Sequence, residues 1–334
     1  DVAGFAVLFI AKIVLMVHMA TTLSLWTATL HFPGLLVPLV CSLVPQEVNS
    51  EEWAKEGCHI DLMARTMMKI TRFSIGPKTR YVTGALILLL TVFCVWETSR
   101  LKIGDPTPGS PVFYDNHPYN QDQAVINKSF DASSENFVLY YEGAAGSVYE
   151  PVVLNTFESF SRHMAERLPD IYKSSTSILN IVSILNRTFH DGDMLWEQLP
   201  LEKEMLTGIL GYIRNTVDRG TLGRFMDATL ERAQITLYFA DHTSDNLLRI
   251  RNAAYDFFRN HPMKIGGGQF VLAGGRIGME IAVNEEMKRS HLLIDLAVYL
   301  AILVLCSLCY RSIVAGLMLT VPLILANSMA ATYM

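Results

Sequence analysis

The side chains best suited to chemistry lie inside apolar stretches of the sequence. Asp295 and Asn327 are polar groups in the last apolar block, and Lys12 and His18 are ionisable groups in the first. Ionisable groups are unfavourable inside a membrane, and they commonly mark a transport path or a proton relay. Asp295 and Asn327 are therefore the candidate transport residues of this chain.

Each of these groups also has a structural interpretation, which we favour in every case. Asp295 lies about one helical turn from the end of its apolar stretch, where water can solvate it. Asn327 can hydrogen-bond across helices instead of contacting a substrate. Lys12 can extend to the membrane edge, and His18 is expected to be a packed histidine rather than a proton carrier.

Other short motifs predict no catalytic chemistry. Cys306 and Cys309 form a CxxC pattern inside an apolar helix, where we favour two small apolar side chains over a metal or redox site. The glycine-rich pieces 266–268 and 274–275 lack the spacing of a nucleotide fingerprint and predict turns. We find no Walker sequence, metal cluster or nucleophile–base pair, so we expect no enzyme and no cofactor. The net charge of −5, without a basic stripe, argues against a nucleic-acid partner.

The apolar residues that surround these candidates gather at the two ends of the chain. Hydrophobic residues make up 51% of the sequence and charged residues 18%. A membrane-spanning helix needs roughly 20 apolar residues. For residues 1–46 we favour two transmembrane helices, near 3–20 and 22–45. Pro33-Gly34 and Pro38 predict that the second half of this block is irregular. One long span with a short apolar tail is the alternative.

Residues 47–78 are predicted to be a cytoplasmic linker that contains an amphipathic helix. That helix either lies in the membrane interface or packs on a neighbouring protein surface. Four basic residues close to the next span indicate a cytoplasmic side by the positive-inside rule: Lys69, Arg72, Lys78 and Arg80. Residues 79–98 are predicted to form a transmembrane helix, with aromatic residues Tyr81 and Trp96 at its ends.

Residues 99–290 contain no spanning run and are predicted to form a water-exposed domain. Strands rich in β-branched and aromatic residues alternate there with amphipathic helices, in two strand–helix units. This repetition predicts two small α+β subdomains. The predicted strands are 137–141, 225–230, 235–239 and 269–273, and the predicted helices are 151–168, 200–217 and 244–260.

Residues 291–334 are predicted to hold two transmembrane helices, 291–310 and 313–334, joined by a very short turn at Arg311-Ser312. If Arg80 is cytoplasmic, residues 99–290 lie outside and Arg311 lies inside, which agrees with its charge. The last helix is rich in small residues, which predicts close packing in a bundle. Because the chain starts without Met and stops inside an apolar run, we expect an internal fragment of a longer protein.

The order of these elements resembles the resistance–nodulation–division (RND) superfamily, especially its MMPL-like exporters. The resemblance covers nearly the whole chain. It rests on several weak motifs in a specific order: Gly104-Asp105-Pro106-Thr107-Pro108-Gly109-Ser110, Tyr119-Asn120, Ala273-Gly274-Gly275, Val283-Asn284-Glu285, Arg311-Ser312-Ile313-Val314-Ala315-Gly316, Pro322-Leu323 and Ala326-Asn327.

The resemblance implies an α-helical transmembrane bundle with an inserted α+β, ferredoxin-like porter domain in the periplasm. Residues 1–46 would be spans five and six of a twelve-span parent, and 99–290 its second porter domain. The implied function is proton-driven export of hydrophobic or amphiphilic compounds, including drugs and lipids, across the cell inner membrane. The proton-carrying acids of the family lie on spans four and ten, so no residue here inherits that role.

The resemblance also implies the partners: the lipid bilayer, a hydrophobic or amphiphilic substrate, a periplasmic or outer-membrane protein, and further copies of the chain. Two alternatives stay open. A protein-translocation accessory or a lipid or sterol handler would share the architecture. A membrane sensor would continue into a signalling segment after a span, whereas here Arg311 leads directly into another span.

Overall fold

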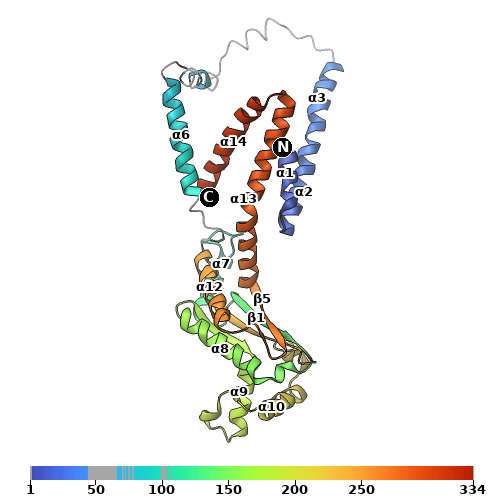
Figure 1. The fold of residues 1–334 in the computed structure, drawn as a ribbon, viewed down its shortest axis with the longest axis vertical. Coiled ribbons are helices and arrows are strands. Elements are labelled where there is room, and N and C mark those ends of the chain that lie inside the picture. Colours follow the sequence, from blue (N-terminus) through green and yellow to red (C-terminus); the bar gives the residue numbers. More distant parts are fainter. Residues whose placement is uncertain are drawn as a thin grey trace. The chain divides into compact units, whose positions relative to one another are not determined.

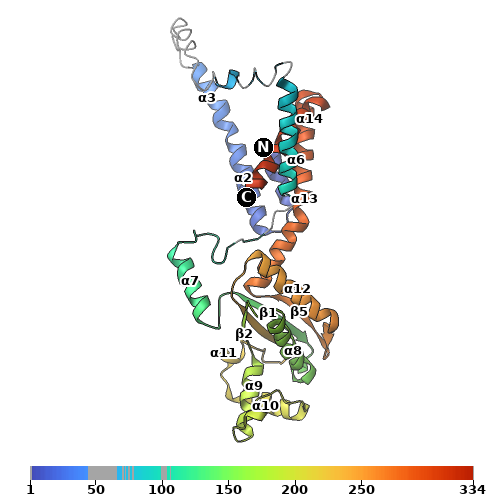
Figure 2. The same ribbon diagram turned by 90° about the vertical axis from the view of Figure 1, so that its left-hand side faces the viewer.

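The computed structural model describes residues 2–43, 66–69, 71, 73, 76, 79–98, 104–105 and 107–333. The chain divides into two compact units (Figures 1 and 2). We call Asp1–Lys102 with Glu286–Met334 the helical unit, and Ile103–Glu285 the sheet unit. Most of the predicted cytoplasmic linker, 47–78, and its amphipathic helix lie outside the described residues.

The first apolar block of the helical unit contains one long candidate span, Val14–Leu43, of 30 residues. Within the described residues this is the one candidate span of the block, as in the alternative of one long span with a short apolar tail. The pair of spans at 3–20 and 22–45 stays a prediction. The elements of this block are α1 (Val2–Ala6), the 3₁₀ helix η1 (Val7–Ile10), α2 (Val14–Thr29) and α3 (His31–Leu43).

The helical backbone of this block is interrupted between η1 and α2. Ala11 and Ile13 have extended backbones, which end the first helical segment, and the exposed Lys12 lies between them. Leu30, in contrast, keeps a right-handed helical backbone between α2 and α3. Pro33 falls in the first turn of α3, where a missing N–H is tolerated, and α3 continues through Pro38, so the irregular second half predicted from these prolines is not observed.

The later helices agree more closely with prediction. α6 (Thr79–Thr98) matches the predicted helix 79–98, although its apolar part, Tyr81–Cys94, is shorter than a usual span. α13 (Gly275–Tyr310) and α14 (Ile313–Tyr333) are both long and apolar enough to cross a membrane. With Val14–Leu43, the described residues therefore contain three candidate spans.

The turn between α13 and α14 brings the two helices close together. Arg311 has a left-handed backbone (φ 49°), and Ser312 N–H donates to the carbonyl of Ser307 at 3.0 Å. Gly316 lies against the Ser307 side chain and the Leu303 carbonyl, where a Cβ atom would collide. The small residue at this position therefore allows the close helix packing that the sequence predicted.

The sheet unit is built on one antiparallel sheet with the strand order β2-β3-β1-β5-β4. Because β3 lies between β1 and β2, and β1 lies between β3 and β5, two strand–helix–strand units interleave as in split βαβ folds. The strands are β1 (Asn136–Gly143), β2 (Tyr172–Ser177), β3 (Arg232–Phe239), β4 (Lys264–Ile265) and β5 (Gly268–Gly274).

This topology changes the prediction of two separate subdomains. The two units, β1–α8–β2 and β3–α12–β5, share a single sheet, and residues 103–285 cluster as one compact unit. Interleaving pairs β1 with β3 between the two units, so the strands of both units contribute to one continuous sheet. The helices between the strands are α8 (Pro151–Arg167) and α12 (Ser244–Asn260), at or within one residue of their predicted bounds.

The core lies between the sheet and the helices α8 and α12 (Figure 2). Alternate residues of the central strands, such as Leu139 and Tyr141 of β1, are fully buried on this face. An edge-to-face contact of Phe157 on α8 with Phe270 on β5, at 5.3 Å between ring centroids, joins the helices to the sheet, and one of Phe160 with Phe257, at 5.2 Å, joins α8 to α12. Such contacts add to the hydrophobic stabilisation of the unit.

A mostly helical insertion connects β2 to β3. It contains the predicted helix 200–217, observed as α10 (Lys203–Thr216). The predicted strand 225–230 is wrong, because only Met226 makes an isolated bridge, to Ala233, and Asp227 orders the rest as a turn. The other helices of this insertion are α9 (Ile178–Phe189), η3 (Met194–Trp196) and α11 (Arg219–Leu222).

Two elements gave no usable sequence signal. β2 has the sequence Tyr-Lys-Ser-Ser-Thr-Ser, which lacks an apolar alternation because it is the edge strand beyond β3. α7 (Pro118–Ser129) is polar overall and begins at a proline. The turn predicted from the glycine-rich piece 266–268 is confirmed, since Gly266 and Gly267 both have positive φ in the turn between β4 and β5.

Candidate functional site

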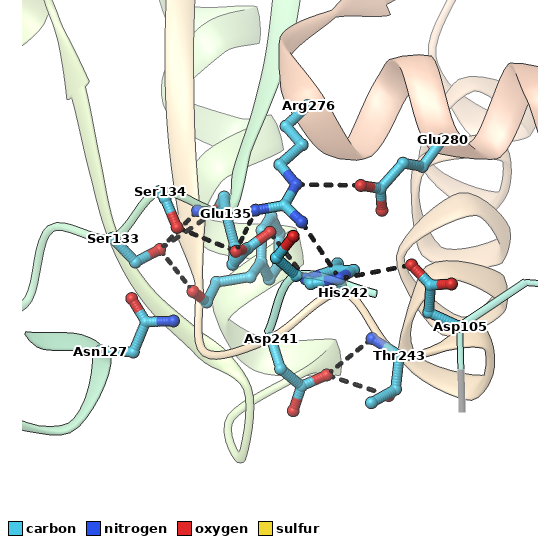
Figure 3. A network of polar contacts seen from close by, with 12 residues as sticks. Asp105, Asn127, Ser133, Ser134, Glu135, Asp241, His242, Thr243, Arg276 and Glu280 are labelled. Carbon is cyan, nitrogen blue, oxygen red and sulfur yellow. Dashed lines mark hydrogen bonds and ion pairs between the residues drawn. The ribbon is translucent and has the colours of Figure 1, made fainter. Parts of the chain in front are cut away.

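A cluster of charged side chains lies where the central strands β1, β3 and β5 begin or end (Figure 3). It joins Glu135, His242 and Arg276, with Asp105 and Glu280 beside them. The side chains of Glu135 and His242 are each 1% exposed, so this is a pair of ionisable groups almost wholly removed from water. Buried charges are retained in proteins only where they are paired and hydrogen-bonded.

The pairing of the strands brings these residues together. Glu135 precedes β1, and β3 and β5 both run antiparallel to β1, so the ends of β3 and β5 lie beside the start of β1. His242 follows β3, and Arg276 follows β5 as the second residue of α13. Three segments that are distant in sequence therefore meet at one point.

Local structure at the start of α13 holds Arg276 in place. Gly275 has a φ of 79° and lies against the backbone of Asn136, so a side chain at this position would collide. The Arg276 N–H donates to Oδ1 of Asn136 at 2.8 Å. These contacts tie the first turn of α13 to the first residue of β1.

The Arg276 guanidinium is the centre of the cluster. Its Nη1 donates to Oε1 of Glu135 at 2.9 Å, and its Nε donates to Oε1 of Glu280, one turn further along α13, at 2.9 Å. Its Nη2 lies 3.2 Å from Nε2 of His242. Because a guanidinium only donates, Nε2 must accept, so a neutral ring carries its proton on Nδ1.

The two ring nitrogens of His242 face different charged groups. Nδ1 is 3.0 Å from Oε2 of Glu135, although the two atoms do not have the alignment of a good hydrogen bond. Oδ2 of Asp105 is 3.7 Å from Nε2, on the same side of the ring as Arg276. The turn that presents the ring is fixed by Asp241, whose Oδ1 accepts from the backbone and hydroxyl of Thr243 at 3.0 and 2.9 Å.

Polar neighbours complete the shell around Glu135. Its Oε1 also accepts from Nε2 of Gln123 and from the hydroxyl of Ser134, each at 2.9 Å. Several buried atoms have no aligned hydrogen bond among the described residues: Oε1 of Gln123, Oδ1 of Asn127, Oε2 of Glu135 and Nδ1 of His242. Oε1 of Glu135 therefore accepts several hydrogen bonds, whereas Oε2 has no aligned donor among the described residues.

The pKa values of the two buried groups are shifted in opposite directions. Burial favours the neutral form of Glu135, but His242, Arg276 and Ser134 together overcome this and hold the pKa of Glu135 below its ordinary value. Burial also favours neutral His242, but the carboxylates of Glu135 and Glu280 outweigh burial and the repulsion from Arg276, so the pKa of His242 is raised. The cluster therefore favours an ionised glutamate and a histidine ready to accept a proton.

This arrangement can bind a proton and pair charges. Within the described residues no group of three or more His, Cys, Asp or Glu side chains could hold a metal ion. Local sequence does not reveal the cluster, because Glu135 and His242 are ordinary polar residues of a segment predicted to be water-exposed. Only the antiparallel pairing of β1 with β3 and β5 shows that they meet.

The predicted transport residues lie elsewhere, in the helical unit. The Asp295 carboxylate is 3.1 Å from Nδ1 of His291, one turn away on α13, and its side chain is 34% exposed. Nδ2 of Asn327 on α14 donates to the hydroxyl of Tyr299 on α13 at 2.7 Å. The predicted hydrogen bond of Asn327 across helices is confirmed, while a contact of either residue with substrate stays a prediction.

The remaining candidates from the sequence are His18, Lys12, Cys306 and Cys309. His18 is exposed on α2, so the prediction of a packed histidine is wrong in this structure, and Lys12 lies exposed in the link before that helix. Cys306 and Cys309 are free thiols on α13.

Comparison with known proteins adds no family to this description. Neither a protein-family model nor a curated protein sequence matches the chain.

Proposed function

We propose that this chain is an internal part of an RND-type, MMPL-like transporter that exports hydrophobic or amphiphilic compounds across the cell inner membrane, driven by protons. The observation that carries the proposal is the order of elements. A split βαβ sheet unit is inserted between α6 and the helix pair α13–α14, and both helices of that pair are candidate spans. This order agrees with the resemblance in the sequence.

The proposal makes α6 a further span. Its 20 residues give a helix about 30 Å long, close to the thickness of a bilayer core. Its apolar part, Tyr81–Cys94, is short, but Tyr81 and Trp96 stand where aromatic rings favour the membrane interface. The hydroxyl of Thr332 on α14 donates to the carbonyl of Cys94 on α6 at 3.4 Å, which supports packing of α6 beside a candidate span.

In this proposal the sheet unit is the porter domain and lies in the periplasm, and the Arg311-Ser312 turn lies in the cytoplasm. Labelling with an impermeant maleimide tests the topology in a variant with the five native cysteines replaced. Leu201→Cys, at a position 81% exposed in the sheet unit, should react in intact spheroplasts, and Ser312→Cys should not. The reverse pattern would invert the proposed topology.

Transport itself is tested with the full-length protein that contains this chain, expressed in a strain without its own pumps. Efflux of a lipophilic dye should exceed that of the empty-vector control and should collapse when a protonophore removes the proton gradient. Efflux that survives the protonophore would contradict proton coupling. No efflux over a broad panel of dyes and amphiphiles would favour a lipid or sterol handler, or a protein-translocation accessory, of the same architecture.

A further inference from the structure

We propose that His242 is a proton-binding site in the sheet unit, and that its ring exchanges Arg276 for Asp105 as the partner of Nε2 when it takes up a proton. This inference does not depend on the proposed transport function. It rests on the geometry around one ring nitrogen, which faces a donor and an acceptor at once (Figure 3).

The neutral ring fits one partner. With its proton on Nδ1, facing Oε2 of Glu135 at 3.0 Å, the ring presents the Nε2 lone pair to the Arg276 guanidinium at 3.2 Å. Asp105, at 3.7 Å, is then too far for a hydrogen bond and has no proton on Nε2 to accept.

The protonated ring fits the other partner. A proton from solvent bonds to Nε2 and makes both ring nitrogens donors, so Nε2 no longer accepts from Arg276, and the two positive groups repel. Arg276 keeps its contacts with Glu135 and Glu280, so it can release His242 without becoming unpaired. The carboxylate of Asp105 is the acceptor nearest to the new N–H.

Asp105 is already held in position to accept this bond. Its carbonyl accepts from the N–H of Ser244 at 2.9 Å and from the Ser244 hydroxyl at 3.0 Å, so its backbone is fixed to the start of α12. A side-chain rotation is enough to close the remaining gap. The Asp105 side chain is also 32% exposed, which gives the proton a route from water to Nε2.

The charged groups that face His242 favour this exchange. Three carboxylates, Glu135, Asp105 and Glu280, and one guanidinium, Arg276, form the ion pairs of this cluster among the described residues. Asp241, the neighbour of His242 in sequence, directs its carboxylate to Thr243 and Asn246 instead. A proton on His242 therefore offsets an excess of negative charge in a site with little access to water.

The consequence is a change in which segments are linked. The neutral ring connects the turn after β3 to the first turn of α13 through Arg276. The protonated ring connects that turn to the segment at Asp105, which enters the sheet unit. Uptake of one proton thus moves a contact from the segment that leaves the unit to the segment that enters it.

Histidine-selective NMR of the full-length chain, in detergent micelles, tests the exchange. The His242 signal is assigned by its loss in His242→Gln. At high pH the unsubstituted protein should show the proton on Nδ1 and a bare Nε2, and on acidification both nitrogens should become protonated. A neutral ring protonated on Nε2, or a ring still neutral at the pH where carboxylates begin to protonate, would overturn the proposal.

Two substitutions separate the partners by the sign of their effect. Asp105→Asn removes the acceptor of the protonated ring and should lower the titration midpoint of His242. Arg276→Gln removes the donor and the positive charge and should raise it. Asp241→Asn is the matched control, since its carboxylate is engaged elsewhere, and it should move the midpoint less than Asp105→Asn does. An unchanged midpoint in Asp105→Asn would also overturn the proposal. The Asp105 side chain is partly exposed, so this substitution leaves no cavity in the hydrophobic core.

Discussion

The sheet unit and the helical unit use polar side chains in different ways. Glu135 and His242 are almost fully buried and are joined to groups from several distant segments. Asp295 and Asn327 stand out in an apolar sequence, yet the side chain of Asp295 contacts His291 on the same helix, and that of Asn327 contacts Tyr299 on the neighbouring helix. The effect of removing a polar group depends on how many buried partners it leaves unpaired, and less on how conspicuous it is in the sequence.

The largest effect is expected from Glu135→Gln. The substitution keeps the shape of the side chain but removes the charge that pairs with Arg276 and His242, and breaking a buried pair in this way destabilises a protein by about 3–5 kcal/mol. Denaturant unfolding of the sheet unit in the full chain, followed by amide exchange in β1 and β3, measures the loss.

Glu142→Gln is the matched control for that substitution. Glu142 pairs with Arg232 at 3.4 Å, and both side chains are about half exposed. Exposed pairs contribute at most about 1 kcal/mol. Equal losses of stability in the two variants would show that the buried cluster stabilises the fold no more than an exposed ion pair does. That result would remove the contrast between the units.

A smaller effect is expected from pH. The pKa of Glu135 is lowered, so its contribution to stability is complete above its ordinary value of 4.5 and is lost as the pH falls through the folded value below that. The pKa of His242 is raised, so its contribution is complete below its ordinary value of 6.5 and is lost as the pH rises through the folded value above that. The cluster therefore stabilises the sheet unit most between pH 4.5 and 6.5.

Denaturation midpoints measured at a series of pH values check this window. Other carboxylates with lowered pKa, Asp170 and Asp227, share the acidic limb, so the diagnostic limb is the basic one. His242→Gln should flatten the fall in stability above pH 6.5. A sheet unit that becomes more stable from pH 6.5 to 8 would contradict the direction assigned to His242.

Much of the sheet unit could be predicted from local sequence, and the cluster could not. Helix 244–260 is found at its predicted bounds, because a periodic apolar face and the flanking polar residues both mark its limits. β2 was missed because an edge strand need not alternate apolar and polar residues. The contact of Glu135 with Arg276 depends on the register of β1 with β5, and the contact of Glu135 with His242 on that of β1 with β3, which no local pattern encodes.

The helical unit shows the same limit in another form. Composition identified the apolar blocks, but not where the first block breaks. Pro33-Gly34 and Pro38 were expected to make the second half irregular, but α3 continues through them, and the helix is instead interrupted at Ala11–Ile13. The hydrogen bond of Asn327 was predictable because an amide in an apolar helix has few other polar partners nearby.

The next effect in size is expected from removal of the hydrogen bond between Asn327 and Tyr299. Asn327→Leu should destabilise the packing of α14 on α13 by about 0.6 kcal/mol, and by no more than about 1.7, the range of such bonds in membrane proteins. Tyr299→Phe removes the same bond from the other side. Thermal unfolding in detergent should show similar losses for the two variants and no further loss in the double variant. A fully additive double variant would mean that the two side chains act separately.

The smallest effect on stability is expected from Asp295→Asn. The contact with His291 joins positions four residues apart on a partly exposed helix surface, and such pairs contribute about 0.5 kcal/mol or less. This small value makes the substitution informative for function, because a loss of efflux could not be ascribed to unfolding. If Asp295→Asn keeps both its stability and its protonophore-sensitive efflux, the carboxylate is a solvated interfacial group. If efflux falls while His291→Gln, which removes the same contact from the other side, retains it, the carboxylate itself takes part in transport.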